Sequence, residues 1–336
     1  MAVLKVCGFE TESAIMTGEG ITLGGSAAVS SAKCHQTPLG YGGTKSILVT
    51  NFGDSVTITT PGSAAADEIH TALYIAAGGS VYLYFTVDGG SVNAHIRWDA
   101  DGYIRIYRGS FTLLATSATT FTNDAWHTFK VVASIRDSGR IRVFRDGSTS
   151  AMVDTGAAVD CRETATDDFA NLVYVGQNSN DVYIDDFAHA SSGLLPDEAL
   201  YVKLIRPTAD GSPVNSTPST GSDRYATVDE STLSTADYNE LAAAGDEDHL
   251  SFGNLGAVPN SIIAVKVHAH ATGQGSVTQM RTLVESGATT AFDSNQGLST
   301  GGTYSGIVDI YETDPDTASA WTQAGVDAAY FGYEAN

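Results

Sequence analysis

The sequence predicts an all-β chain with a larger N-terminal β-sandwich followed by a smaller antiparallel β-sandwich. Apolar and polar residues alternate in short runs, most clearly over residues 80–87, as expected for half-buried strands. The 35 glycines, together with many Ser and Thr, separate these runs as turn residues, and no long helical pattern interrupts them. At 336 residues and 42% hydrophobic content, the chain is long enough to build two cores.

The first domain is predicted to be a meander of hairpins. Residues 80–87 and 92–98 flank the turn Asp88-Gly89-Gly90, and residues 103–107 follow a second turn at 99–102, so neighbouring strands should pair antiparallel. Residues 68–76 fit either a helical turn or a strand, and the β context favours a strand. The remaining strands are expected over residues 2–10, 46–50, 55–59, 126–133, 139–145, 171–176 and 181–188.

The domain boundary is predicted from an apolar strand over residues 182–188, which is followed at once by Leu194-Leu195-Pro196. We therefore divide the chain into domains 1–192 and 193–336. In the second domain the pattern predicts a strand that Pro207 stops, a polar loop, three further strands, one short helix and a closing strand. These elements cover residues 200–206, 208–224, 262–271, 278–286, 304–312, 317–329 and 330–334.

The charge of the chain argues against two classes of partner. A net charge of -22 with only 17 Lys+Arg is unsuited to nucleic acid or an anionic membrane surface. The densest basic cluster, Arg136, Arg140, Arg142 and Arg145, alternates with apolar residues and is interpreted as a solvated strand face. No run of 18 apolar residues predicts a membrane span, and residues 1–10 lack the pattern of a secretory signal peptide.

The chain has three cysteines, Cys7, Cys34 and Cys161. Because three is a small and odd number, they do not indicate a disulfide framework. We expect free, mostly buried thiols, with a Cys7–Cys34 disulfide as the alternative.

Residues 126–133, 139–147 and 183–187 resemble the concanavalin A-like or laminin G-like sandwich. Trp126-His127 opens one strand, and a hairpin ending in Asp146-Gly147 follows it. The resemblance covers roughly residues 1–190 and implies a jelly-roll β-sandwich.

The second half, taken together with the first, resembles a group of structural proteins of tailed bacteriophages. The segments that carry this likeness are residues 202–211, 225–230, 245–248, 311–315 with Trp321, and 331–334. The resemblance implies a virion component, such as a capsid decoration, head-fibre or tail-associated protein, that is made in the host cytoplasm and contacts other virion proteins. Because virion proteins usually assemble on symmetry, we also expect a homo-oligomer.

No catalytic pattern supports an enzyme. The glycosidase pattern Glu-x-Asp-x-x-Glu begins at Glu312-Thr313-Asp314, but Pro315 interrupts it and Thr317 occupies the last position. Asp185 and Asp186 are adjacent and should point to opposite faces of their strand, with one of them outwards. No Gly-x-Ser-x-Gly segment lies between a predicted strand and a predicted helix, which a nucleophile elbow requires, so Ser/His/Asp catalysis has no support.

Cofactors are not predicted, although calcium remains an alternative because sandwiches of this type often bind it through loop carboxylates. The available acids are Asp99, Asp101, Asp167, Asp168, Asp181, Asp185 and Asp186. His268 and His270 share a spacing that zinc ligands use, but no third ligand is near in sequence, so we interpret them as structural.

Five aromatic residues of the meander are the candidate ligand-binding or interface residues: Tyr82, Tyr84, Trp98, Tyr103 and Tyr107. They could stack on sugar rings, pack between subunits, or form a core or cross-strand ladder. The leading hypothesis is a non-enzymatic structural protein of a phage particle. The alternative is a lectin-like, carbohydrate-binding module for host-surface glycans, and a hydrolase is disfavoured.

Overall fold

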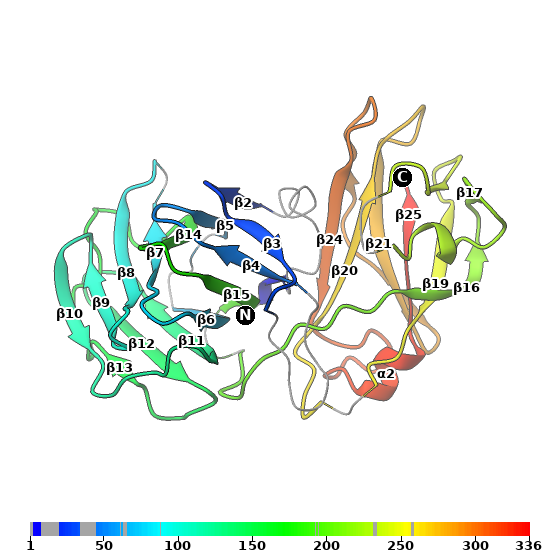
Figure 1. Ribbon diagram of the computed structural model, residues 1–336. Helices are drawn as coiled ribbons and strands as arrows, with labels where there is room; N and C mark the ends of the chain where they lie inside the picture. The colour runs from blue at the N-terminus through cyan, green and yellow to red at the C-terminus, as the bar shows by residue number, and fades with distance from the viewer. Residues whose placement is uncertain are drawn as a thin grey trace. The chain divides into compact units, whose positions relative to one another are not determined.

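A computed structural model describes residues 3–7, 20–33, 45–60, 62, 66–87, 89–191, 193, 195–230, 234–256 and 259–336 (Figure 1). The chain divides into two compact units, Met1–Val202 and Lys203–Asn336. Within the described residues the regular structure is strand, apart from helix α2 (Gln323–Ala328) and one turn of 3-10 helix. The predicted all-β fold class is therefore confirmed, and no described helix has the length and apolar character needed to cross a membrane.

The first unit is a sandwich of two antiparallel sheets. One has eight strands in the order β13-β12-β11-β6-β15-β4-β3, with β1 paired to β15, and the other has seven in the order β10-β9-β8-β7-β14-β5-β2. The eight-stranded sheet contains β1 (Val3–Cys7), β3 (Ala28–Ser30), β4 (Ser46–Val49), β6 (Asp67–Ile75), β11 (Trp126–Ser134), β12 (Arg140–Arg145), β13 (Val153–Asp154) and β15 (Val182–Ser191). The seven-stranded sheet contains β2 (Ile21–Gly24), β5 (Ser55–Thr59), β7 (Val81–Thr86), β8 (Val92–Trp98), β9 (Ile104–Arg108), β10 (Thr112–Thr116) and β14 (Asn171–Gly176).

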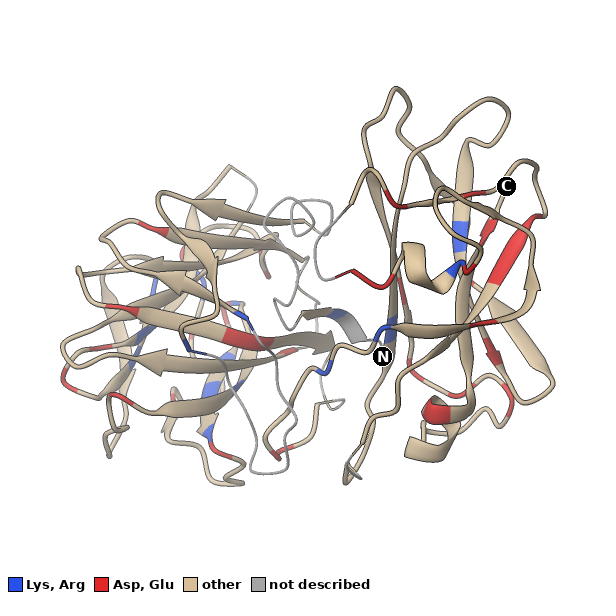
Figure 2. Ribbon diagram, turned by 45° about the vertical axis from the view of Figure 1, so that its right-hand side comes forward, with Lys and Arg blue, Asp and Glu red and all other residues tan. Residues whose placement is uncertain are grey.

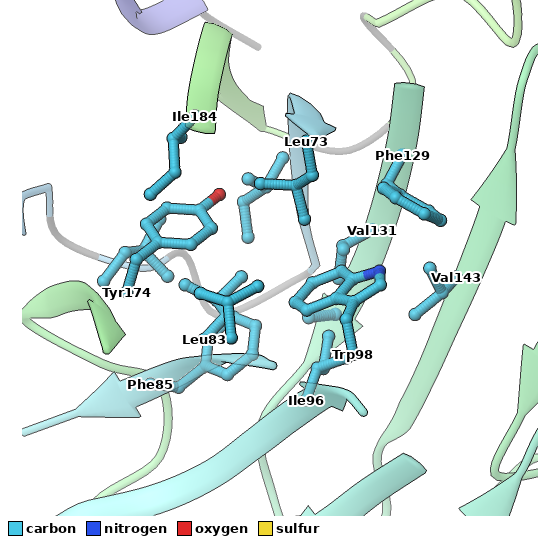
Figure 3. Packing of buried hydrophobic residues seen from close by; sticks show 14 of the residues in the cluster. Leu73, Leu83, Phe85, Ile96, Trp98, Phe129, Val131, Val143, Tyr174 and Ile184 are labelled. Carbon is cyan, nitrogen blue, oxygen red and sulfur yellow. The ribbon is translucent and has the colours of Figure 1, made fainter. Parts of the chain in front are cut away.

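The core of this unit lies between the two sheets (Figure 3). Strand β7 shows why: Val81, Leu83 and Phe85 are fully buried, while the tyrosines between them are partly exposed. Side chains of one parity on each strand thus meet the opposite sheet, as the period of two requires. The largest of the fully buried side chains are Trp98, Tyr174, Phe85, Phe129 and Phe187.

Residues 195–202 run over the outer face of the eight-stranded sheet and are hydrogen-bonded to it. The backbone N–H of Leu195 donates to Glu68 (2.7 Å), and that of Leu200 donates to His70 Nε2 (3.0 Å). Lys130 Nζ donates to the carbonyl oxygen of Leu195 (2.6 Å). These bonds explain why the first unit ends after Val202 rather than after residue 192, where the sequence places the boundary.

Strand β15 carries a β-bulge at Asp185 and Asp186. The register with β6 shifts between Asp185 and Ala188, and Asp186 adopts a positive φ of 46°. Both residues are fully buried, so neither carboxylate reaches solvent. Asp186 Oδ1 instead accepts a hydrogen bond from the backbone N–H of Val202 (2.8 Å), so the bulge anchors the end of the segment 195–202.

The second unit is a smaller sandwich. A sheet in the order β16-β19-β25-β21-β22, with β23 paired to β21, packs against the antiparallel pair β20–β24. Its core includes Val284, Trp321, Val326 and Phe331. The strands are β16 (Pro207–Val214), β17 (Thr217–Pro218), β18 (Asn239–Glu240), β19 (Glu247–Phe252), β20 (Val265–Ala271), β21 (Gln279–Ser286), β22 (Thr289–Phe292), β23 (Gln296–Gly297), β24 (Ser305–Tyr311) and β25 (Tyr330–Ala335).

Two sequence predictions fail at the start of this unit. Residues 201–206 form no strand, and the strand begins at Pro207 and runs through what the pattern assigns to a polar loop. Strand β16 lies at the edge of its sheet, where a proline as the first residue removes no hydrogen bond from the ladder. Helix α2, in contrast, lies inside its predicted range, with Thr322 as the N-cap that accepts from Gly325 N.

Two of the three cysteines are described, and both Cys7 and Cys161 are buried free thiols. Burial raises the pKa of Cys161 to about 11, which leaves its thiol protonated and unreactive at neutral pH. Cys34, and with it the alternative Cys7–Cys34 disulfide, lies outside the described residues.

Candidate functional site

Three of the five predicted aromatic residues meet on the outer face of the seven-stranded sheet. Tyr82 and Tyr84 project from β7, and Tyr107 projects from β9, on the side opposite the core. All three are partly exposed. The ring centroids of Tyr82 and Tyr84 are 6.1 Å apart in an edge-to-face arrangement.

The other two aromatic residues do not join them. Trp98 is fully buried in the core, with its ring centroid 5.4 Å from that of Phe129, so its assignment to a surface site is wrong. It ends β8 on the inward-facing parity, together with Ala94 and Ile96. Tyr103 precedes β9 and packs against Arg105, whose guanidinium carbon lies 5.5 Å from the ring centroid.

Two residues of β8 that sequence reasoning missed, His95 and Arg97, complete the site. In the register of the sheet, His95 lies opposite Tyr84 on one side and Tyr107 on the other, and Arg97 lies opposite Tyr82. Period-two parity from the buried Ile96 would have placed both on the outer face. We call the five residues Tyr82, Tyr84, His95, Arg97 and Tyr107 the aromatic face.

The aromatic face is layered. The rings of His95 and Tyr107 stack with centroids 4.7 Å apart and planes 2° from parallel. The guanidinium carbon of Arg97 lies 4.1 Å from the ring centroid of Tyr107 and 4.4 Å from that of Tyr82. His95 also stacks on Tyr82, at 5.9 Å and 27°. An imidazole and a guanidinium therefore lie side by side between two tyrosine rings.

Hydrogen bonds fix the protonation state of His95. Its Nε2 accepts from Arg97 Nε (2.8 Å), which always carries a proton, and its Nδ1 lies 2.6 Å from the carbonyl oxygen of Gly109. Only the neutral tautomer with the proton on Nδ1 satisfies both. Burial lowers the pKa of His95, the bond to Gly109 raises it and the charge of Arg97 lowers it, with a result of about 4.

Tyr82 and Tyr84 stay protonated at neutral pH. Burial is the main cause that raises the pKa values of Tyr82 and Tyr84, and the charge of Arg97 opposes it at both. Each phenol can therefore donate as well as accept a hydrogen bond. The aromatic face thus combines ring surfaces with several fixed polar groups, which suits a polyhydroxylated ligand.

Several of the acids proposed for calcium form ion pairs with arginines. Asp99 and Asp101 both bind Arg105, and Asp167 binds Arg162. Among the described residues, no group of three or more His, Cys, Asp or Glu side chains is placed to hold a metal ion. His268 and His270 lie side by side on β20, with ring centroids 4.3 Å apart.

The first unit contains a Thr–His–Asp arrangement that no sequence motif predicts. His189 Nδ1 lies 2.5 Å from Thr60 Oγ1, and its Nε2 lies 2.9 Å from Asp67 Oδ1. The three residues are exposed by 2% or less, so a substrate has no access to the hydroxyl. The arrangement gives buried polar side chains their hydrogen-bond partners, and Thr60 and His189 are 129 residues apart in sequence. We therefore interpret it as structural.

Basic residues are sparse over the ribbon, and acidic residues occur on strands and loops of both units (Figure 2). On β12, Ile141 and Val143 are buried while Arg140 is exposed and paired with Asp154, in keeping with a solvated strand face. The charges therefore do not form the basic surface that a nucleic acid requires.

No family model matches the chain, and no curated protein matches it. Solved structures with a likeness include a Bacillus subtilis protein of unknown function with a galectin-like fold, at 10% identity and a TM-score of 0.42, over 56% of this chain and 96% of that one. The galectin LEC-6 of Caenorhabditis elegans matches at 14% identity and 0.31, over 43% and 95%. The carbohydrate recognition domain of Emp46p matches at 10% and 0.34, over 54% and 89%. At these identities and TM-scores the likenesses assign no function to the chain.

Proposed function

We propose that the first unit is a non-catalytic carbohydrate-binding module and that the aromatic face is its binding surface. The observation that carries this proposal is the His95–Arg97 pair held between Tyr82 and Tyr107 on the outer side of a sheet. Sugars present apolar C–H patches and hydroxyl groups together, and sites for them combine aromatic surface with a few fixed polar groups.

Pre-organisation supports the proposal. Arg97 is held by two ring contacts and by its bond to His95, and His95 is held by Gly109. Ordering a free arginine side chain on binding costs about 0.5–1.5 kcal/mol, and a side chain that is already ordered avoids most of this. A rigid sheet surface of this kind is suited to weak, reversible recognition of a flexible saccharide.

A glycan array followed by calorimetry on the best ligand tests this function. Tyr84→Ala and Tyr107→Ala each remove a ring of the aromatic face and should weaken binding by about tenfold or more, which corresponds to about 1.4 kcal/mol. Tyr238→Ala is the matched control, since it removes a tyrosine ring that is 44% exposed in the second unit. Absence of binding to every saccharide on the array, or equal losses in all three variants, would reject the proposal.

As a second candidate function, we propose that the whole chain is a structural component of a tailed-phage particle, with the second unit as its framework. The separate segments that resemble such proteins are bonded to one another. Asp210 accepts from the N–H groups of Arg224 and Tyr225, Tyr333 donates to Asp248, and Trp321 Nε1 donates to the Tyr311 carbonyl oxygen. All of these bonds lie within the second unit, so the segments belong to one folded unit.

The virion proposal and its corollary, a homo-oligomer, have direct tests. Mass spectrometry of purified particles should detect the chain, and immunogold labelling should show whether it lies on the capsid or the tail. Light scattering on the purified full chain should give a multiple of the monomer mass of 35.0 kDa. Absence from particles would refute the virion role, whereas a monomeric chain would refute only the oligomer.

A further inference from the structure

Within the described part of this acidic chain, six arginines are neutralised by carboxylates of the fold. Ion pairs with N···O distances of 4 Å or less hold several arginines to carboxylates, and two of these arginines take two carboxylates each at 2.6 Å. The pairs are Arg105 with Asp99 and Asp101, Arg108 with Asp160 and Glu163, Arg140 with Asp154, Arg145 with Asp146, Arg162 with Asp137 and Asp167, and Arg281 with Glu334.

Arg97 is different from its neighbour on the sheet. It lies directly opposite Arg105 on the neighbouring strand. Asp99 and Asp101 both form ion pairs with Arg105. Among the described residues Arg97 has no carboxylate within ion-pair distance, and its guanidinium contacts two tyrosine rings, His95 and the Ser110 carbonyl oxygen. Because Asp99 and Asp101 already neutralise Arg105, Arg97 is the member of this pair that lacks a carboxylate partner in the described part of the chain.

The guanidinium of Arg97 also keeps unused donors. An arginine carries five N–H groups. Its Nε donates to His95, and Nη2 makes one long contact of 3.4 Å with the Ser110 carbonyl oxygen. The Nη1 group makes no hydrogen bond within the described part of the chain and belongs to a partly exposed side chain. A planar fork with free N–H groups matches the two oxygens of a carboxylate or of a sulfate ester.

The tip of the β9–β10 hairpin lies beside this fork. Gly109 and Ser110 supply the two carbonyl oxygens that His95 and Arg97 contact, and the next residue, Phe111, is 91% exposed. Leu113, which pairs with Tyr107, is 52% exposed. Apolar surface therefore continues from the aromatic face along the hairpin, as a ligand longer than one sugar ring would require.

Resting on the proposed carbohydrate-binding function, we propose that the aromatic face selects anionic saccharides and that Arg97 holds their acidic group. The acid is a sugar carboxylate, as in sialic or uronic acids, or a sulfate ester. Both present a pair of anionic oxygens to the planar fork. The tyrosine rings beside Arg97 partly exclude water, which strengthens the attraction between the guanidinium and the anion.

The test is a glycan array that carries neutral, sialylated, uronic-acid and sulfated saccharides, probed with the full chain and three variants. The wild type should bind acidic saccharides, and the carboxylated and sulfated spots tell the two sources apart. Arg97→Gln should lower binding of the acidic ligands by about tenfold or more. Arg97→Lys keeps the charge without the fork and should lose less than Arg97→Gln. Arg140→Gln, which removes a paired cation on the other sheet of the sandwich, should leave the preference intact.

Each outcome decides a different point. The inference is supported if acidic saccharides bind, if added NaCl weakens this binding, and if the binding depends on Arg97. Neutral saccharides that bind equally well, or an acid preference that survives Arg97→Gln in a folded variant, overturn it and leave the carbohydrate-binding function standing. No binding to any saccharide overturns both. If Arg97→Gln does not fold, the salt dependence of the wild type and the Arg97→Lys variant still decide.

Discussion

Arg97 donates a 2.8 Å hydrogen bond from Nε to Nε2 of His95, and this bond holds a buried histidine in its neutral form. Protonation of His95 would place two donors face to face and bring a second positive charge beside the guanidinium. Burial is the main cause that lowers the pKa of His95 from its ordinary value of 6.5 to about 4, and the charge of Arg97 lowers it as well, while the bond to Gly109 raises it. Stability and charge at this site are therefore linked.

His95→Gln should remove a pH dependence of folding. Because the folded state takes up its proton near pH 4 and the unfolded state near pH 6.5, the wild type loses stability from this group as pH falls through that window. The loss should be on the order of 2–3 kcal/mol. Urea unfolding at pH 4 and pH 7.5 should show a smaller difference for the variant. An identical difference in both proteins would contradict a neutral His95.

Asp309→Asn should stabilise the second unit at high pH. Burial raises the pKa of Asp309, its bond from Thr282 lowers it and Asp293 raises it, to about 6. The folded state thus keeps a proton that the unfolded state loses near pH 3.8, and stability falls as pH rises from 3.8 to 6. We expect the variant to exceed the wild type by about 1–2 kcal/mol at pH 8, with no gain at pH 4.

Asp293→Asn is the matched test of the same pair, since it removes the other charge. It should give a gain of the same sign at pH 8, measured as the thermal midpoint of the full chain. If neither variant gains stability above pH 6, the two carboxylates do not interact in the folded state.

Lys130→Met should strongly destabilise the first unit. Its ammonium lies 3.4 Å from Glu68 Oε1, and both side chains are less than one-tenth exposed. Removing one partner leaves a buried charge, which typically costs about 3–5 kcal/mol. The double variant Lys130→Met with Glu68→Gln should recover much of this, because the amide that replaces the carboxylate is neutral and can still accept from the N–H of Leu195. Equal losses in the single and double variants would show that packing, rather than charge, dominates.

Asp54→Asn should weaken the hydrogen bonds that connect the turn at Ser26 with the turn at Asn51 in the first unit. Burial raises the pKa of Asp54, but hydrogen bonds from the backbone of Ser26, Asn51 and Thr50 and from the Ser26 hydroxyl outweigh it and lower the pKa to about 2. At pH 7 the variant should lose about 2 kcal/mol. As pH falls from 3.8 towards 2, this advantage of the wild type should vanish in acid unfolding experiments.

Period-two alternation predicted much of the first unit. Runs such as residues 80–87 identified both the strand and the side of it that faces the core, because burial of every second residue leaves a direct mark on the sequence. Grouping Trp98 with the tyrosines by residue type assigns it to the surface. Its parity, two residues after Ile96, places it in the core.

Features that depend on register were not predictable in the same way. His95 and Arg97 belong to the site because Tyr82 and Tyr107 lie opposite them, and the pairing of strands is set by tertiary contacts. The sequence does not predict the bulge at Asp185 and Asp186 or the strand that begins at Pro207, for a related reason. A bulge shifts parity without a clear signal, and a proline is tolerated on an edge strand that the sequence does not identify as one.

The hydrogen bonds of residues 195–202 set where this chain can be cut. A fragment ending at residue 192 would strip Leu195, Leu200 and Val202 from the sheet and leave Glu68, His70 and Asp186 without these donors. Such a fragment should aggregate or unfold easily, because buried carboxylates that lose their donors are costly. A fragment that extends to Val202 retains them all, and is the shortest piece in which the glycan hypothesis can be examined apart from the second unit.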